Sequence, residues 1–135
     1  MSKLDLLTRV RELCEEHEVA RIVVGKPLRL SGEAGPAAEA FLKRYRADWL
    51  FLGCAGVDAG QVTNYDEAVL ASERLMIERS AKLVLLADHT KVGRTAMCQL
   101  CGTKELNHFI TGPDAPRQIL RQIAKARVGV ITVSR

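Results

Sequence analysis

Short apolar runs alternate with amphipathic segments along most of this chain. The runs are rich in β-branched and aliphatic residues, as strands buried on both faces are, and they occupy residues 20–25, 49–53, 82–87, 107–111 and 128–133. Between them, apolar residues recur at helical spacing, which predicts helices over residues 4–17, 36–46, 66–79 and 114–126. The order predicts a single α/β domain over residues 1–135, a three-layer αβα sandwich with about five mainly parallel strands, Rossmann- or flavodoxin-like.

Two stretches fit this alternation poorly. Residues 54–65 are rich in Gly, Asp, Thr and Asn, and we expect them to form a loop between a strand and the next helix. Residues 88–102 are harder to interpret, with one or two helical turns expected over Thr95 to Leu100. The chain also opens with a helix, whereas folds of this class commonly open with a strand.

Composition narrows the class of protein. The chain has 135 residues, 47% of them hydrophobic and 27% charged, with a net charge of +4, which is ordinary for a soluble domain and well short of a nucleic-acid-binding run. The cluster Lys43, Arg44 and Arg46 is interpreted as the cationic end of a helix. No signal peptide or membrane span is visible, so we expect a cytoplasmic protein without a membrane partner.

The four cysteines do not form a disulfide framework. Cys98 and Cys101 form a CxxC pair, but the second pair typical of a zinc site is absent, and the pair does not open a helix after a strand as redox pairs do. We therefore interpret these residues as half-buried thiols. We expect no metal, no cofactor and no catalytic residue.

A string of motifs in the second part of the chain resembles a known family. The segments DWLFLGCAGVD, TNYDEA, ERLMIERSAKLVLLADHTKVGRTAM and ELNHFITG resemble the C-terminal effector domain of DeoR-type transcription repressors, over residues 47–135. The resemblance implies a non-enzymatic domain that senses phosphorylated sugars or related metabolites. In that family a separate helix-turn-helix binds DNA, so we expect no direct DNA contact from this chain. That helix-turn-helix and the family's first effector strands are not visible in this sequence.

Residues 5–40 resemble something else, a fragment of YqgF-type, Holliday-junction-resolvase-like nucleases. Two resemblances in one chain suggest either a chimera of two fragments or a natural truncated paralogue. We favour the chimera, with the join between about Gly35 and Ala47. The two family patterns overlap near Gly35 to Phe41, and an alternative is that residues 32–53, GEAGPAAEAFLKRYRADWLFLG, are DeoR-type throughout. Two further alternatives stay open for the function, an inert chimeric or engineered scaffold and a nuclease-like domain that processes nucleic acid.

Candidate binding residues follow the predicted strands over 49–53 and 82–87. In open parallel sheets ligands bind at the carboxyl ends of strands, and helix N-termini hold anions. A phosphorylated sugar or similar small anion is the expected ligand, and the candidates are Gly53, Asp58, Thr63, Asn64, Glu67, Asp88 and Lys91.

The same residues have a purely structural alternative. Thr63 to Glu67 could simply cap the helix, and Lys91 could be a solvated loop lysine. Ala55 also stands where the resembled family often has an aspartate. We further expect a homodimer, because an apolar face left bare would favour self-association.

Overall fold

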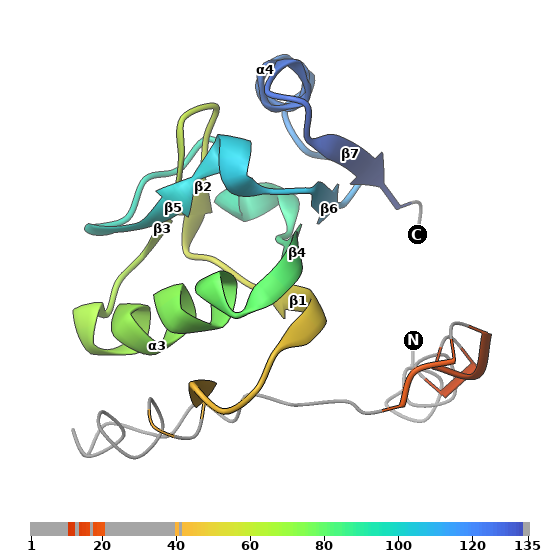
Figure 1. The fold of residues 1–135 in the computed structure, drawn as a ribbon. Helices are drawn as coiled ribbons and strands as arrows, with labels where there is room; N and C mark the ends of the chain where they lie inside the picture. Colours follow the sequence, from red (N-terminus) through yellow and green to blue (C-terminus); the bar gives the residue numbers. More distant parts are fainter. Residues whose placement is uncertain (1–10, 13, 17, 21–39, 41, 134–135) are drawn as a thin grey trace. The chain divides into compact units, whose positions relative to one another are not determined.

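The computed structural model describes residues 11–12, 14–16, 18–20, 40 and 42–133, and the chain divides into two compact units, Met1–Leu30 and Ser31–Arg135 (Figure 1). In the first unit, Arg11, Glu12 and residues 14–16 are helical, as predicted for that stretch. The strand expected over 20–25 lies, apart from its first residue, outside the described residues. Ala40 and Leu42 are helical, in agreement with the helix expected there. The single domain expected over the whole chain stays a prediction.

The second unit is built on a four-stranded parallel sheet, which confirms the α/β fold. Its strands are β1 (Ala47–Leu52), β4 (Ser80–Leu86), β6 (His108–Thr111) and β7 (Gly129–Thr132). They are ordered β1-β4-β6-β7, and each neighbouring pair is parallel. Helix α3 (Glu67–Glu78) lies in the connection from β1 to β4 and leads directly into β4, and helix α4 (Arg117–Lys125) joins β6 to β7.

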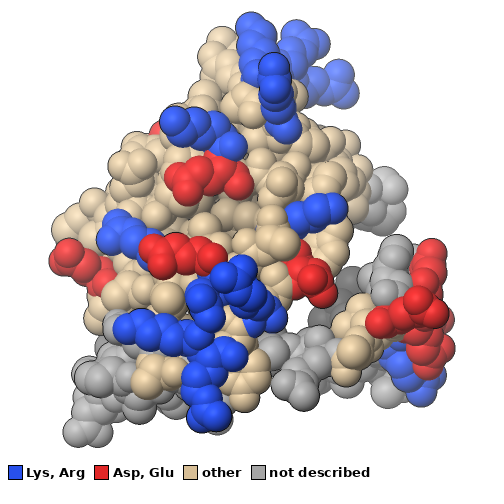
Figure 2. Space-filling view, in the orientation of Figure 1, with Lys and Arg blue, Asp and Glu red and all other residues tan. Residues whose placement is uncertain are grey.

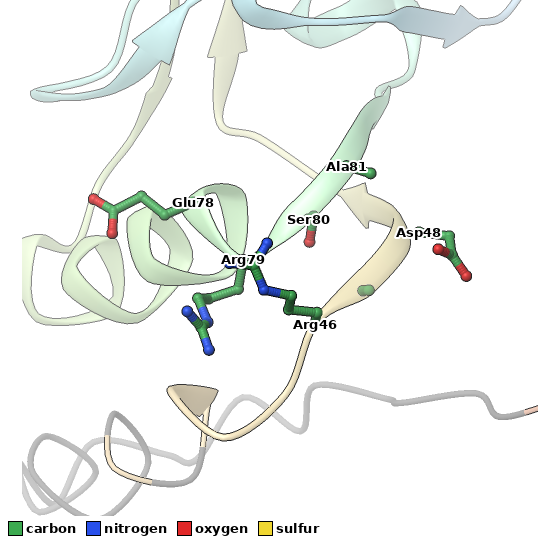
Figure 3. A pocket seen from close by; sticks show the side chains of 7 residues that line it. Arg46, Asp48, Glu78, Arg79, Ser80 and Ala81 are labelled. Atoms are coloured by element: carbon green, nitrogen blue, oxygen red, sulfur yellow. The ribbon is translucent and has the colours of Figure 1, made fainter.

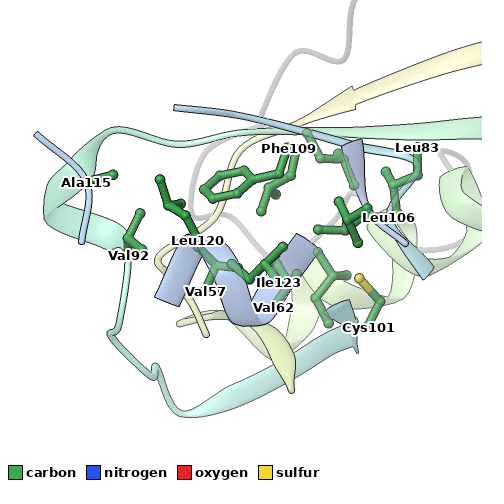
Figure 4. Close-up of a cluster of buried hydrophobic side chains, with 14 of the residues drawn as sticks. Val57, Val62, Leu83, Val92, Cys101, Leu106, Phe109, Ala115, Leu120 and Ile123 are labelled. Carbon is green, nitrogen blue, oxygen red and sulfur yellow. The ribbon is translucent and has the colours of Figure 1, made fainter. Parts of the chain in front are cut away.

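The hydrophobic core lies on one face of this sheet. Every connection moves one strand further in the same direction, and right-handed crossovers then place all the connecting elements on the same face. Leu85 and Phe109 contribute the sheet side of the core, and Leu70 from α3 with Leu120 and Ile123 from α4 contribute the helix side (Figure 4). The two helices therefore bury their apolar stripes against adjacent strands of one sheet.

The two stretches that fit the alternation poorly, residues 54–65 and 88–102, together form a second sheet. Three short antiparallel strands, β2 (Gly56–Val57), β3 (Gln61–Asn64) and β5 (Cys98–Gly102), pair in the order β2-β3-β5. The helical turns expected over 95–100 are wrong, because Cys98 onward is a strand paired with β3. Two short 3-10 helices, η1 (His89–Lys91) and η2 (Thr103–Glu105), flank β5. The pairing of β3 with β5, which are distant in sequence, determines the secondary structure of this region and overrides the preference of its local sequence.

The opposite face of the parallel sheet is apolar and partly exposed. Trp49 and Phe51 of β1 are 45% and 58% exposed, and the large apolar residues Leu86, Ile131 and Val133 are also exposed. The ring of Trp49 stacks on His108 of β6 with centroids 5.9 Å apart, and Lys82 Nζ lies 4.6 Å from the Trp49 ring. This surface, called the outer face below, is the side of the sheet that α3 and α4 do not cover.

Candidate functional site

The carboxyl ends of β1 and β4 bring together residues that are far apart in sequence. Leu52 is the register partner of Leu85, so Gly53 and Cys54 follow β1 beside the point where β4 ends. Beyond β4, Asp88 accepts hydrogen bonds from the backbone nitrogen of Thr90, at 2.8 Å, and from its hydroxyl, and so starts η1, which contains Lys91. The predicted pair Asp88 and Lys91 thus lies next to the β1 end that holds Gly53.

The charges of Lys91, Asp88 and Glu73 all act on one side chain, the half-buried thiol of Cys54. Burial raises the pKa of Cys54 to about 11, Lys91 opposes the rise, and Asp88 and Glu73 add to it. The thiol is therefore neutral at ordinary pH. It acts as a small packing group and not as a nucleophile.

Glu73 of helix α3 belongs to the same cluster. Its Oε2 accepts a hydrogen bond from Nδ2 of Asn64 at 2.9 Å. Burial raises the pKa of the Glu73 carboxyl, and the bond from Asn64 partly opposes that rise. Asn64, a predicted site residue, therefore faces the cluster through Glu73.

Sequence reasoning missed Cys54 and Glu73. Cys54 directly follows a predicted site glycine at a strand end, and Glu73 lies one helical turn after the buried Leu70. The only signal in the sequence for either residue was its position, next to a predicted site residue or to a predicted core residue. Together with Asn64, Asp88 and Lys91 they form what we call the strand-end cluster.

Two other predicted residues stabilise the second sheet. Asp58 Oδ1 accepts hydrogen bonds from the backbone nitrogens of Gly60 and Gln61, at 2.8 and 2.9 Å, so it holds the turn between β2 and β3. The hydroxyl of Thr63 is buried, donates to the backbone oxygen of Gly56 at 3.2 Å and accepts from the backbone nitrogen of Ala96 at 2.8 Å. Their polar atoms are engaged within the chain.

Glu67 is exposed in the first turn of α3, where a carboxylate interacts favourably with the helix dipole. The cap of that helix is Asp66, whose Oδ1 accepts from the backbone nitrogen of Ala68 at 2.9 Å. Asp88 is fully exposed, and its hydrogen bonds from Thr90 are the main reason that its pKa lies below the ordinary value.

Two shallow pockets lie away from the strand-end cluster. One, of about 170 Å³, is lined by residues that include Arg46, Asp48, Glu78 and Arg79 and lies at the amino ends of β1 and β4 (Figure 3). The other, of about 220 Å³, lies between α3 and β5, with Arg74 on one side and Cys101 on the other. Their linings mix cations with carboxylates, and neither contains a predicted site residue. Among the described residues, no group of three or more His, Cys, Asp or Glu side chains could hold a metal.

Comparison with known proteins gives a consistent result. Residues 6–113 match the family described as the DeoR C terminal sensor domain. The HTH-type transcriptional regulator GlpR of Haloferax volcanii is 38% identical over 125 residues, which cover 89% of this chain and 48% of that protein. The glycerol-3-phosphate regulon repressor of Haemophilus influenzae is 30% identical over 112 residues, 82% of this chain and 44% of that protein. The repressor of the same name from Escherichia coli K12 is 29% identical over 103 residues, 74% and 41% of the two chains.

These matches bear on the origin of the first part of the chain. The family match begins at residue 6 and runs without interruption through the stretch where a join between two families was expected. The YqgF-like segment and the chimera therefore receive no support, and the DeoR-type alternative accounts for that stretch. The chain spans about half the length of the curated relatives it matches.

Proposed function

This chain belongs to the DeoR C-terminal sensor domain family, and from that premise we propose that it is the effector-sensing part of a DeoR-type transcription regulator. The relatives are transcription regulators and not enzymes. By analogy we propose a regulatory and non-enzymatic role for this chain. Two of them are named as repressors of a glycerol-3-phosphate regulon. We propose a small phosphorylated sugar or polyol as the ligand of this chain.

The strand-end cluster is the observation that carries this proposal. Lys91 is a half-buried cation beside Gly53, at the carboxyl ends of two adjacent parallel strands, where ligands of open α/β sheets bind. A lysine interacts with a phosphate as a point charge. Asp88 and Glu73 are carboxylates that repel a phosphate but accept hydrogen bonds from hydroxyl groups. A ligand with one anionic end and a hydroxyl-bearing end satisfies both kinds of group.

Of the other predicted residues, Asn64 acts through Glu73, whereas Asp58 and Thr63 support the loop that presents Gly53. Glu67 is a carboxylate at the α3 N-terminus and partly offsets the positive end of the helix dipole there. We propose contacts with the ligand for Gly53, Asp88, Lys91 and Glu73, and indirect roles for the others.

Isothermal titration calorimetry tests this proposal. The purified chain is titrated with a panel of sugar phosphates and glycerol 3-phosphate, with glycerol and inorganic phosphate as partial ligands. We expect Lys91→Gln to weaken binding of the best ligand at least about 10-fold, about 1.4 kcal/mol. The exposed Lys104 lies on η2, outside the cluster, and Lys104→Gln makes the same charge change as a control.

A thermal-shift assay provides the contradicting outcome. A bound ligand raises stability by RT ln(1 + [L]/Kd), so an unchanged unfolding midpoint at ~10 mM of every compound excludes useful affinity. That result would favour the alternative of a scaffold without ligand binding.

We also propose a cellular location and an oligomeric state for this chain. Among the described residues, no helix is both long and apolar enough to cross a membrane. A regulator of transcription acts where the DNA is, so we propose a cytoplasmic location. The expected homodimer is retained as a prediction, and the outer face is the feature that favours it.

A further inference from the structure

Helix α4 presents a row of cations on its exposed side. Arg117, Arg121 and Lys125 follow one another at intervals of four residues and are all exposed, whereas Leu120 and Ile123 are buried on the other side. Figure 2 shows blue side chains gathered at the end of the molecule where Figure 1 places α4. With a rise of about 1.5 Å per residue, the three cations extend over roughly 12 Å of helix surface.

Lys125 lies in the last turn, where the helix dipole favours a cation, but the rest of this arrangement opposes the stability of the helix. Helix α4 contains no acidic residue, so the row has no carboxylate within the helix to offset the repulsion between like charges four residues apart. Arg117 also lies in the first turn, where the partial positive charge of the helix dipole disfavours a cation. From residue 114 to residue 127 the chain has four cations and a single carboxylate, Asp114.

The fourth cation, Arg127, has a strained backbone conformation. Its backbone is left-handed, with φ of 65°, directly after the helix-ending residue Ala126. Glycine is the residue usually found at this position, because a Cβ atom disfavours the left-handed conformation. Here the position holds an arginine, which extends the row of exposed cations beyond the end of the helix.

We propose that this basic face, made of Arg117, Arg121, Lys125 and Arg127, binds the phosphate backbone of duplex DNA. The choice of DNA rests on the proposed function, because a transcription regulator holds its sensor domain close to a duplex. B-DNA has one negative charge per about 1.7 Å of axis, so a row about 12 Å long faces several phosphates at once. Such contacts position a protein on DNA without reading its sequence. This proposal differs from the expectation, drawn from the family resemblance, that the chain makes no direct DNA contact.

Fluorescence anisotropy of a labelled duplex of about 20 base pairs tests the proposal on the intact chain. Neutralising three or four phosphates gives a slope of log K against log salt of about −3, so affinity should fall roughly 40- to 150-fold between about 50 and 200 mM salt. The triple variant R117Q/R121Q/K125Q should lose at least about 10-fold in affinity at the lower salt and give a slope near −1.

The chain offers a matched control. Lys43, Arg44 and Arg46 are also exposed, and K43Q/R44Q/R46Q removes the same three charges from another place. We expect this control to keep the slope of the unmodified chain. Equal losses in both triple variants would show an effect of net charge and overturn the assignment to α4, as would absence of binding by the unmodified chain.

Arg127→Gly separates a DNA contact from a role in folding. Relief of the left-handed strain should raise the unfolding midpoint by about 3 °C, while affinity for the duplex falls several-fold. A variant that is stabilised and binds DNA as tightly as before would remove Arg127 from the basic face.

Ligand titration keeps this inference distinct from the proposed function. The α4 triple variant should bind the sugar phosphate as the unmodified chain does, because none of its substitutions is in the strand-end cluster. Ligand binding without DNA binding overturns only the present inference. DNA binding without ligand binding overturns the proposed sensing role.

Discussion

Nδ2 of Asn64 donates a hydrogen bond to Oε2 of Glu73 over 2.9 Å and so joins strand β3 to helix α3. The bond lies in a region where burial raises the pKa of the Glu73 carboxyl. In the unfolded chain this carboxyl would titrate at about pH 4.3. The folded protein therefore binds the proton more tightly than the unfolded chain, and Glu73 links stability to pH.

The first prediction concerns the variant Glu73→Gln. A raised folded-state pKa gives a stabilising contribution that is fully present below about pH 4 and is lost as pH rises through the folded pKa. Glutamine cannot ionise and retains an oxygen that can accept from Asn64, so the loss disappears. Thermal unfolding between about pH 4 and pH 7 should show a flatter dependence on pH for the variant. Parallel curves for the two proteins would contradict the role of Glu73.

The second prediction concerns a buried hydroxyl. Thr111 is only 2% exposed, and its Oγ1 has no hydrogen-bond partner among the described residues. Thr111→Val keeps the shape and removes the unpaired group, so the unfolding free energy should be unchanged or rise by about 1 kcal/mol. This corresponds to a midpoint shift of up to about 3 °C in a thermal unfolding experiment.

A matched threonine gives the control for that experiment. Thr103 is 0% exposed, and its hydroxyl donates to the backbone oxygen of Asp58 at 2.8 Å. Thr103→Val leaves this acceptor unpaired and should lower stability by about 1–3 kcal/mol. Equal losses for the two valine variants would mean that the Thr111 hydroxyl makes a bond of similar value.

The third prediction concerns the close approach of two chain segments at Gly56. A Cβ atom at this position would lie 2.3 Å from the backbone oxygen of Arg94 and 2.7 Å from its carbonyl carbon. Because both are backbone atoms, Gly56→Ala must move a segment of chain and should cost about 3 kcal/mol, measured by urea unfolding. At Gly112 a Cβ atom would meet nothing within 4 Å. Gly112→Ala should therefore be neutral or slightly stabilising, and a large loss there would argue against the steric explanation.

Sequence patterns predicted the parallel sheet well, because each of its strands is a continuous apolar run between helical segments. The runs that contain Phe51, Leu85 and Phe109 form the neighbouring strands β1, β4 and β6. Leu85 and Phe109 are buried in the core. The second sheet was missed for a physical reason. Its strands are short, β3 has a register shift between Val62 and Thr63, and its pairing with β5 joins residues 34 to 41 positions apart.

The residues of the strand-end cluster were predicted only in part, for a related reason. Asp88 and Lys91 follow the end of a strand, and strand ends in a parallel sheet lie at one edge, so their position could be inferred. Asp58 and Asn64 were grouped with them by proximity in sequence. The turn between β2 and β3 then engages the Asp58 carboxylate with its own backbone, whereas Asn64 faces Glu73. Side-chain partners such as these depend on pairings distant in sequence, which a single sequence does not reveal.

The fourth prediction concerns the outer face and self-association. Phe51 is 58% exposed on β1, the first of the four described parallel strands, and lies on the same side of the sheet as Trp49. Exposed apolar side chains on one face of a sheet favour association with a second copy of the chain. We expect light scattering coupled to size exclusion to show a dimer, and Phe51→Lys to shift the population to the monomer. The substitution places a charge in the contact, and burial of an unpaired charge is costly.

An exposed apolar residue elsewhere tests whether that shift is specific. Met97 is 84% exposed and precedes β5, away from the parallel sheet. Met97→Lys makes the same change in charge and hydrophobicity and should leave the dimer intact, because an interface of standard size is decided by the residues at its centre. A monomer in the unmodified chain at every concentration, or equal dissociation by both lysine variants, would remove the outer face as the site of association.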